Sequence, residues 1–300
     1  MEKKLFLETT IEDCNELSSL NLDFISKFVF RGQSNSEWEL ISSLERLVKL
    51  YHPHAISFYN ILDCYGQKIL EEFKWKYPVY GKSYIPQEND SLEWLSIMQH
   101  YGSPTRMVDF TYSPYIALFF AIYNSSAERC AIWCLNRFVY EFSLHEEYIK
   151  ITKENVINPL DFNRYIYNQV NDRLNGYIVN DSSPGIFLIR PRQINDRLCR
   201  QQGLFAIPGD MNLCFKTNVF SKIKNNTPQE VSFKDIIDYS NSKEGIYKQA
   251  DIALIKINIP TKLRYEITQF LRKMNISAET LFSDLEGLAK SMSLIRMKME

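Results

Sequence analysis

The sequence predicts a single α+β domain, in which a mixed or antiparallel sheet is surrounded by helices and followed by a helical C-terminal part. Two observations lead to this prediction. Short apolar runs typical of buried strands recur along the chain, and segments with apolar residues at helical spacing lie between them. No internal repeat, low-complexity stretch or clean linker divides the 300 residues. One domain of this class is therefore the simplest arrangement.

Five short runs are the strand candidates. The first is followed at once by Arg31-Gly32-Gln33, and the last alternates like a half-exposed strand until Pro260 stops it. The candidates are residues 28–30, 131–136, 186–191, 204–207 and 253–259.

Helical spacing of apolar residues predicts most of the remaining elements. Ser34 to Ser36 offer N-caps for a helix that we expect to begin at Trp38. The expected helices are a short one within 11–27, then 38–50, 53–77, 91–100, one after Pro114, 262–274 and one from 278 onward.

The domain organisation follows from these elements. We expect residues 1–25 to be an N-terminal extension, 26–215 the core domain, and 216–300 an α/β continuation of the same domain. Residues 140–183 are rich in Asn and Tyr, and we expect them to form a variable insertion or a lid.

Composition excludes several classes of protein. A formal net charge of -1 and a pI near 6.5 argue against attachment to nucleic acid or anionic lipid through overall charge. The longest apolar run, 112–123, is shorter than the ~20 residues that span a bilayer, and acidic residues interrupt the N-terminal apolar stretch. We therefore expect no membrane association and a cytoplasmic location. Six scattered cysteines without a CxxC pair and four histidines without zinc-ligand spacing predict reduced thiols and no metal.

The stretch QHYGSPTRMVDFTYSPYIALFFA, residues 99–121, holds the densest group of polar residues with chemical potential. His100, Arg106 and Asp109 fall within ten residues, and a Gly-Ser-Pro turn separates the first two. Such a turn brings polar side chains to one place. Pro114 then suits the first turn of a helix whose apolar residues predict burial.

Two further polar clusters lie at predicted strand ends. Arg31 offers a planar fork of donors suited to phosphate, and Gly32 permits close backbone approach to a ligand. Gln201 and Gln202 precede the strand at 204–207. A purely structural interpretation stays open, in which Arg31 and Asp109 form a buried ion pair.

These motifs resemble those of the FRG-domain family, named for the residues that stand here as Phe30-Arg31-Gly32. The resemblance covers FRGQ at 30–33, the block at 99–121, RQQGLF at 200–205 and TLFSDLEGLA at 280–289, so it spans most of the chain. It implies a cytoplasmic bacterial protein in phage defence or a toxin, by association with the family rather than by chemistry.

A weaker resemblance is to ADP-ribosyltransferases of the Arg-Ser-Glu type, and it implies a related fold and NAD as substrate. In those enzymes an arginine at the end of an early strand grips NAD, which corresponds to Arg31. A Ser or Thr near a strand-helix junction follows, which Thr111 and Ser113 match. The late glutamate of the pattern is replaced here by Gln201 or Gln202.

Two functions follow from this sequence. In the first, the protein binds NAD or a related nucleotide and cleaves its N-glycosidic bond, by transfer to a protein or nucleic-acid acceptor or by hydrolysis. The residues that bind the nucleotide and those that act on it would lie in one cleft. Gln33 would be one of the residues that contact the nucleotide. Arg31 and Arg106 would hold phosphates, His100 would orient ribose or move a proton, Asp109 would stabilise the cationic sugar, and Gln201 or Gln202 would form the opposite wall.

In the second, the same fold binds a nucleotide or a protein as a sensor without chemistry, and the polar set is structural. The sequence does not define the oligomeric state.

Overall fold

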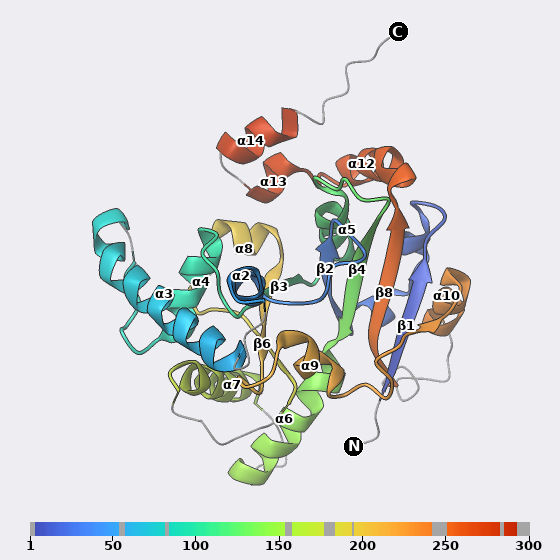
Figure 1. Cartoon of the computed structure of the whole chain (residues 1–300). Coiled ribbons are helices and arrows are strands. Elements are labelled where there is room, and N and C mark those ends of the chain that lie inside the picture. Colours follow the sequence, from blue (N-terminus) through green and yellow to red (C-terminus); the bar gives the residue numbers. More distant parts are fainter. Residues whose placement is uncertain are drawn as a thin grey trace.

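The computed structural model describes residues 4–53, 58–81, 84–153, 158–176, 184–193, 195–241, 251–282 and 285–292. It confirms the α+β class, because one eight-stranded mixed sheet is surrounded by helices (Figure 1). The strand order is β5-β6-β3-β2-β4-β8-β1-β7. No described helix combines the length and the apolar character that crossing a membrane requires.

The five expected strands are all present, and three further strands were not expected: β3 inside the sheet, and β1 and β7 at one end of it. The expected strands are β2 (Phe28–Gln33), β4 (Arg129–Asn136), β5 (Ile186–Ile189), β6 (Gly203–Pro208) and β8 (Ile252–Pro260), and the sheet also contains β3 (Val108–Thr111), β1 (Leu5–Thr10) and β7 (Gln229–Glu230). β1 runs parallel to β8 and β7, whereas the pairs from β5 through to β8 are antiparallel.

The expectation that residues 1–25 form an extension was wrong. Leu5–Thr10 is a strand between β8 and β7, and Phe6 and Leu7 are buried on opposite faces of the sheet. The run LFLETT is short and half polar, so its strand character depends on pairing with β8, which lies about 250 residues away in the sequence. Pairing with β8, and not local sequence propensity, therefore makes this segment a strand.

The helices occupy two sides of the sheet. The first half of the chain contributes short turns η1 (Glu16–Ser19) and α1 (Leu22–Ile25), then α2 (Ser43–Tyr51), α3 (Phe58–Tyr80), α4 (Ser91–His100), α5 (Pro114–Ile122), α6 (Arg137–Thr152) and α7 (Pro159–Leu174). The second half contributes α8 (Asp196–Arg200), α9 (Phe215–Phe220), α10 (Phe233–Asn241), η2 (Thr261–Leu263), α12 (Arg264–Lys273), α13 (Ala278–Phe282) and α14 (Leu285–Met292).

Each group of helices covers a different part of the sheet (Figure 1). Helices α5, α10 and α12 cover one face of β2, β4 and β8, and α3, α4 and α7 cover β5 and β6. Helices α6 and α9 pack on the opposite face. Helix α5 packs against β2 and β4, and α4 belongs to the cluster that covers β5 and β6. Strand β3, which lies between β6 and β2, is therefore flanked by these two helices.

Helix α5 confirms the prediction of a buried helix after Pro114. The Ser113 hydroxyl accepts a hydrogen bond from the Ile116 N–H, and Pro114 occupies the first turn. Phe119 is buried, and Phe120 is half-buried against the same core. The helix lies close to β2 because Gly32 faces it: a Cβ atom at Gly32 would lie 2.0 Å from the Ala117 carbonyl oxygen.

The helix expected to begin at Trp38 begins at Ser43 instead. Ser42 is its N-cap, and Ser42 and Glu45 form a reciprocal capping box. Residues 34–42 therefore form a loop, which leaves Trp38 outside any helix.

The expected insertion, residues 140–183, contributes to the core over its described part. Helix α7 places Phe162, Ile166 and Val170 in the same apolar cluster as Trp94 and Met98 of α4. Helix α7 also makes the polar contacts that hold the first turn of α4, so this region supports the helix that carries His100.

Candidate functional site

A cavity opens where β2 and β3 separate. These strands pair only at Phe30 and Thr111, whereas β2 pairs with β4 along six residues, as far as Gln33. Beyond the single β2–β3 pair lies a cavity of about 750 Å³. This volume is within the range of about 300–1,000 Å³ that is usual for small-molecule sites.

The cavity is walled by β2, β3, α2, α4, α8 and the loop at 34–42. Its polar and charged lining consists of Arg31, Gln33, Ser34, Glu37, Glu39, Arg46, Lys49, Ser96, Gln99, His100, Asp109, Thr111, Asn195, Arg197 and Gln201, and its apolar lining includes Phe30, Trp38, Ile41, Phe110, Phe120, Leu198 and Phe205.

Arg31 of β2 lines this cavity. Its Nη1 donates to the main-chain carbonyl of Asp109 at 2.8 Å, and its Nε is buried without a hydrogen-bond partner among the described residues. Burial lowers the pKa of Arg31, the Asp109 carboxylate opposes this change, and the positive charge of Arg46 adds to it. The expected alternative of a direct Arg31–Asp109 ion pair is not what the structure shows, because the contact is to the backbone.

Arg46 of α2 supplies a second guanidinium to the cavity. Its Nη1 donates to the Ile41 carbonyl at 3.1 Å. Within the described ranges, neither Arg31 nor Arg46 has a carboxylate within 4.0 Å. Two guanidinium groups without a paired carboxylate in one cavity form a site suited to an anion.

Asp109 is held in place by an amide. Gln99 Nε2 donates to Asp109 Oδ2 at 2.8 Å, and Gln99 Oε1 accepts from the Thr105 hydroxyl at 2.5 Å. Because a carboxylate oxygen accepts, the Gln99 amide nitrogen must face Asp109, and the amide oxygen then faces the Thr105 hydroxyl, which can donate to it. The Asp109 side chain is exposed to the cavity and keeps lone pairs for a ligand.

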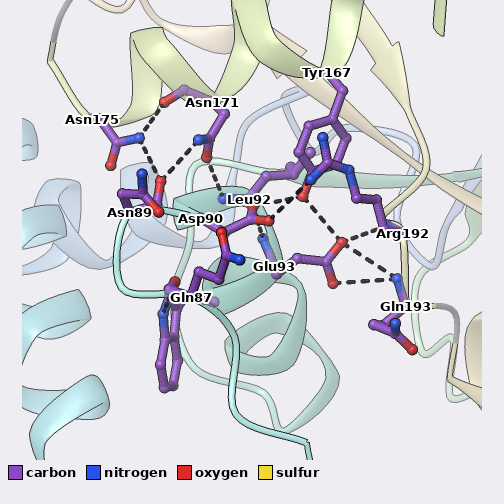
Figure 2. A network of polar contacts seen from close by, with 11 residues as sticks. Gln87, Asn89, Asp90, Leu92, Glu93, Tyr167, Asn171, Asn175, Arg192 and Gln193 are labelled. Atoms are coloured by element: carbon purple, nitrogen blue, oxygen red, sulfur yellow. Dashed lines mark hydrogen bonds and ion pairs between the residues drawn. The ribbon is translucent and has the colours of Figure 1, made fainter. Parts of the chain in front are cut away.

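His100, the last residue of α4, also lines the cavity, and its ring is 4.7 Å from that of Tyr101. Figure 2 shows the network that fixes the other end of α4. The buried Glu93 carboxylate accepts from the backbone N–H groups of Arg192 and Gln193, and the Tyr167 hydroxyl reaches both Glu93, at 3.1 Å, and Asp90, at 2.6 Å. Helix α4 therefore presents His100 from a fixed support.

Other residues at the same helix end complete this network. Asn171 Oδ1 accepts from the Leu92 N–H at 3.2 Å, and Asn171 and Asn175 both donate to the Asn89 carbonyl at 2.9 Å. The Arg192 guanidinium lies 3.8 Å from the centre of the Tyr167 ring. These contacts join α4, α7 and the segment after β5 (Figure 2).

Gln33 and Gly32 line the cavity, but both have contacts that serve the fold. Gln33 is buried, where its Oε1 accepts from Trp133 Nε1 at 2.8 Å and its Nε2 donates to the Glu39 carbonyl at 3.2 Å. Gly32 permits the approach of helix α5, rather than only that of a ligand.

Thr111 and Gln201 also reach the cavity wall with their polar groups engaged. The Thr111 hydroxyl donates to the Gln201 carbonyl at 2.7 Å, and Gln201 Nε2 donates to the Leu281 carbonyl at 3.2 Å. These contacts join β3, α8 and α13. Both residues therefore hold the wall together, and their side chains have less to offer a ligand than Arg31 or Asp109.

Three expected site residues lie elsewhere, so the expectation of one cleft for the whole set was wrong for them. Arg106 is buried behind α2, where Nη2 pairs with Asp63 at 2.6 Å and Nη1 donates to the Met211 carbonyl at 2.7 Å. Ser113 caps α5. Gln202 adopts a positive φ of 46° in the turn before β6 and is exposed outside the cavity.

The sequence analysis missed several residues of the site, among them Trp38, Glu39, Arg46 and Gln99. Gln99 is adjacent to His100, and the Gly-Ser-Pro turn that we used to group polar residues also brings Thr105 to Gln99. Arg46 carried no local signal, because a cationic residue on a helix is usually solvated. No group of three or more His, Cys, Asp or Glu residues suited to a metal occurs within the described part of the chain.

One family model matches part of the chain. The model of the FRG domain matches residues 26–130, which include β2, α2, α3, α4, β3 and α5. Arg31, Arg46, Gln99, His100 and Asp109 all lie inside this match. Searches of curated proteins and of solved structures gave no significant match.

Proposed function

The chain carries an FRG domain, and we propose that this domain binds a pyrophosphate-containing nucleotide between β2 and β3 and cleaves its N-glycosidic bond, with NAD as the leading candidate. The observation that carries this proposal is the pair of guanidinium groups, Arg31 and Arg46, that face one cavity without a carboxylate partner in the described chain. Arg46 takes the phosphate-binding role that the sequence suggested for Arg106.

The proposed binding step depends on charge and shape. Guanidinium groups bind phosphate oxygens through paired N–H donors, and they do so more strongly away from bulk water. Among the described residues, the Arg31 guanidinium has one hydrogen-bond acceptor, the Asp109 carbonyl, so its other outer N–H groups are available to an acceptor that enters the cavity. A nucleotide supplies this acceptor, and its phosphates offset the repulsion between Arg31 and Arg46.

The proposed chemical step uses Asp109. Breaking the bond between ribose C1 and the base nitrogen leaves positive charge on the sugar, and a nearby carboxylate lowers the energy of that state. The Gln99 amide fixes the orientation of the Asp109 carboxylate. Nicotinamide keeps the electrons of the broken bond and leaves as a neutral molecule, water or an acceptor nucleophile bonds to C1, and the proton of that nucleophile passes to solvent. His100 would orient the ribose hydroxyls.

A second candidate is a nucleotide sensor without chemistry. Two observations favour it. Gln202, at the place of the late glutamate in the Arg-Ser-Glu pattern, lies outside the cavity, and one face of the Asp109 carboxylate is occupied by Gln99. Binding without cleavage would leave the role of Arg31 and Arg46 unchanged.

One experiment separates these candidates. Purified protein is incubated with NAD, and released nicotinamide is quantified for the wild type, Asp109→Asn and Glu37→Gln. Glu37 is the matched control, because it is an exposed carboxylate that lines the same cavity. We expect release by the wild type and Glu37→Gln, and a loss of about 100-fold or more in Asp109→Asn, a size typical of removing one electrostatic stabiliser.

Binding of NAD is measured in parallel by calorimetry. Binding without release of nicotinamide would support the sensor. Neither binding nor release would contradict the proposed nucleotide site.

A further inference from the structure

Trp38 is a large exposed aromatic residue at the cavity, in the loop between β2 and α2. Its exposed fraction is 56%. Two of the other three tryptophans give a contrast: Trp94 and Trp133 are buried, and their indole N–H groups donate to Gln87 O and Gln33 Oε1. Over the described residues, Trp38 makes no ring stacking or cation–π contact, although it lines the cavity.

The loop around Trp38 is fixed at several points. The Ser36 N–H donates to the Arg129 carbonyl at 2.9 Å, and the Trp38 N–H donates to the Asn35 carbonyl at 3.3 Å. The carbonyl of Glu39 accepts from the buried Gln33. An exposed side chain on a fixed loop loses less conformational entropy on binding a partner than one on a mobile loop.

The Glu39 side chain adds another anchor. Its Oε2 accepts from Lys49 Nζ at 2.7 Å, and its Oε1 accepts from Lys216 Nζ at 3.0 Å. These two hydrogen bonds lower the pKa of Glu39 to about 2. The carboxylate therefore stays charged at ordinary pH, and it bonds the loop to Lys49 of α2 and Lys216 of α9.

We propose that Trp38 is the stacking surface for the base of a bound nucleotide whose phosphates lie on Arg31 and Arg46. This inference rests on the proposed function and assigns the orientation of the ligand. Trp38 follows Arg31 by seven residues, and both line the cavity with Arg46. A ligand that combines an anionic group with a planar ring matches this arrangement, because an indole face stacks on bases of any sequence.

The test compares inorganic pyrophosphate with ADP, which adds a base and a ribose to the same anion. Affinities are measured by calorimetry for the wild type, Trp38→Leu and Trp38→Phe. The matched control is Trp75→Leu, because Trp75 is exposed on α3 and does not line the cavity.

We expect Trp38→Leu to bind ADP roughly 5- to 100-fold more weakly, the range that corresponds to stacking one base, and to bind pyrophosphate as the wild type does. Trp38→Phe should retain part of the ADP affinity. ADP should also quench indole fluorescence in the wild type and Trp75→Leu, and this quenching should be lost in Trp38→Leu.

Two results would overturn the inference alone: unchanged ADP affinity in Trp38→Leu, or an equal loss of affinity for ADP and pyrophosphate. A wild-type protein that binds neither ligand would contradict the proposed function as well.

Discussion

The two polar regions around α4 differ in how their charges are paired. At the first turn of the helix, Glu93 and Asp90 are engaged by Tyr167, by Arg192 and by backbone N–H groups (Figure 2). At its other end lies the cavity, where Arg31 and Arg46 have no carboxylate partner among the described residues. One end of α4 therefore lies in a network whose carboxylates have hydrogen-bond or ion-pair partners, which we call the saturated network. The other end lies at a cavity with two arginines that lack a carboxylate partner among the described residues.

This difference separates residues that hold the fold from residues that are available to a ligand. Groups in a saturated network leave buried partners unsatisfied when they are removed, and the fold loses stability. Arg31 and Arg46, by contrast, each have one protein acceptor among the described residues. We therefore expect substitutions in the network to change stability and substitutions in the cavity to change binding.

The largest expected effect is that of Glu93→Ala. This change removes the acceptor of the Arg192 and Gln193 backbone N–H groups and one acceptor of Tyr167. Since each unsatisfied buried group costs about 1–3 kcal/mol, we expect a loss of about 3 kcal/mol in the free energy of unfolding, measured by urea denaturation. Glu88→Ala, an exposed neighbour, is the control. Equal stability of the two variants would show that the network does not hold α4.

A smaller loss is expected for Arg106→Ala, which tests the reassignment of this residue from ligand binding to the fold. The change removes the donor to Met211 O, and it leaves Asp63 unpaired but largely in solvent. We expect a loss of about 1–3 kcal/mol, while Arg164→Ala, in an exposed pair with Asp161, should cost less than about 1 kcal/mol. Reduced nucleotide affinity in folded Arg106→Ala would return this residue to the binding site.

The smallest expected effect is a change in the pH dependence of stability. Burial raises the pKa of Glu93 above its ordinary value of 4.5, although hydrogen bonds from Arg192 N–H, Tyr167 and Gln193 N–H partly oppose this. A raised pKa in the folded state means that this stability is fully present below pH 4.5 and is lost as pH rises through the folded pKa. Glu93→Gln should remove this contribution, so its stability should fall less than that of the wild type as pH rises above 4.5. An identical slope in both proteins would contradict the assignment.

The fold was predictable where local pattern and tertiary structure agree. The helix at 91–100 was predicted with the observed bounds, because Asp90 caps it and its apolar residues face the core. The strand predicted at 253–259 is one residue longer at each end in the structure. Residues 5–10 were missed, since their pairing with β8 is parallel and distant, and no local sequence pattern reports it. The start of α2 was misplaced because Ser34, Ser36 and Ser42 are all acceptable caps, and the reciprocal contact with Glu45 selects the last.

Part of the site was predictable, because some of its residues are placed by local structure. Arg31, His100 and Asp109 are adjacent to a strand end or a turn, so local sequence brings them to the sheet opening. Arg106 is close to Asp109 in sequence, but it precedes β3 and its guanidinium pairs with Asp63. Arg46 could not be found, because its place in the cavity depends on how α2 packs against the sheet.

The most direct test of the central claim is nucleotide binding and thermal melting of Arg31→Lys, Arg46→Lys and Arg106→Lys, measured side by side. Lysine keeps the charge but loses the paired donors of the guanidinium. We expect the first two variants to melt within a few degrees of the wild type and to bind ADP about tenfold or more weakly, which corresponds to losing one charge-assisted hydrogen bond of roughly 1.5–3 kcal/mol. Arg106→Lys should instead melt earlier and, while folded, bind as the wild type does. Wild-type ADP affinity in folded Arg31→Lys and Arg46→Lys would contradict the claim that these two residues form the anion site.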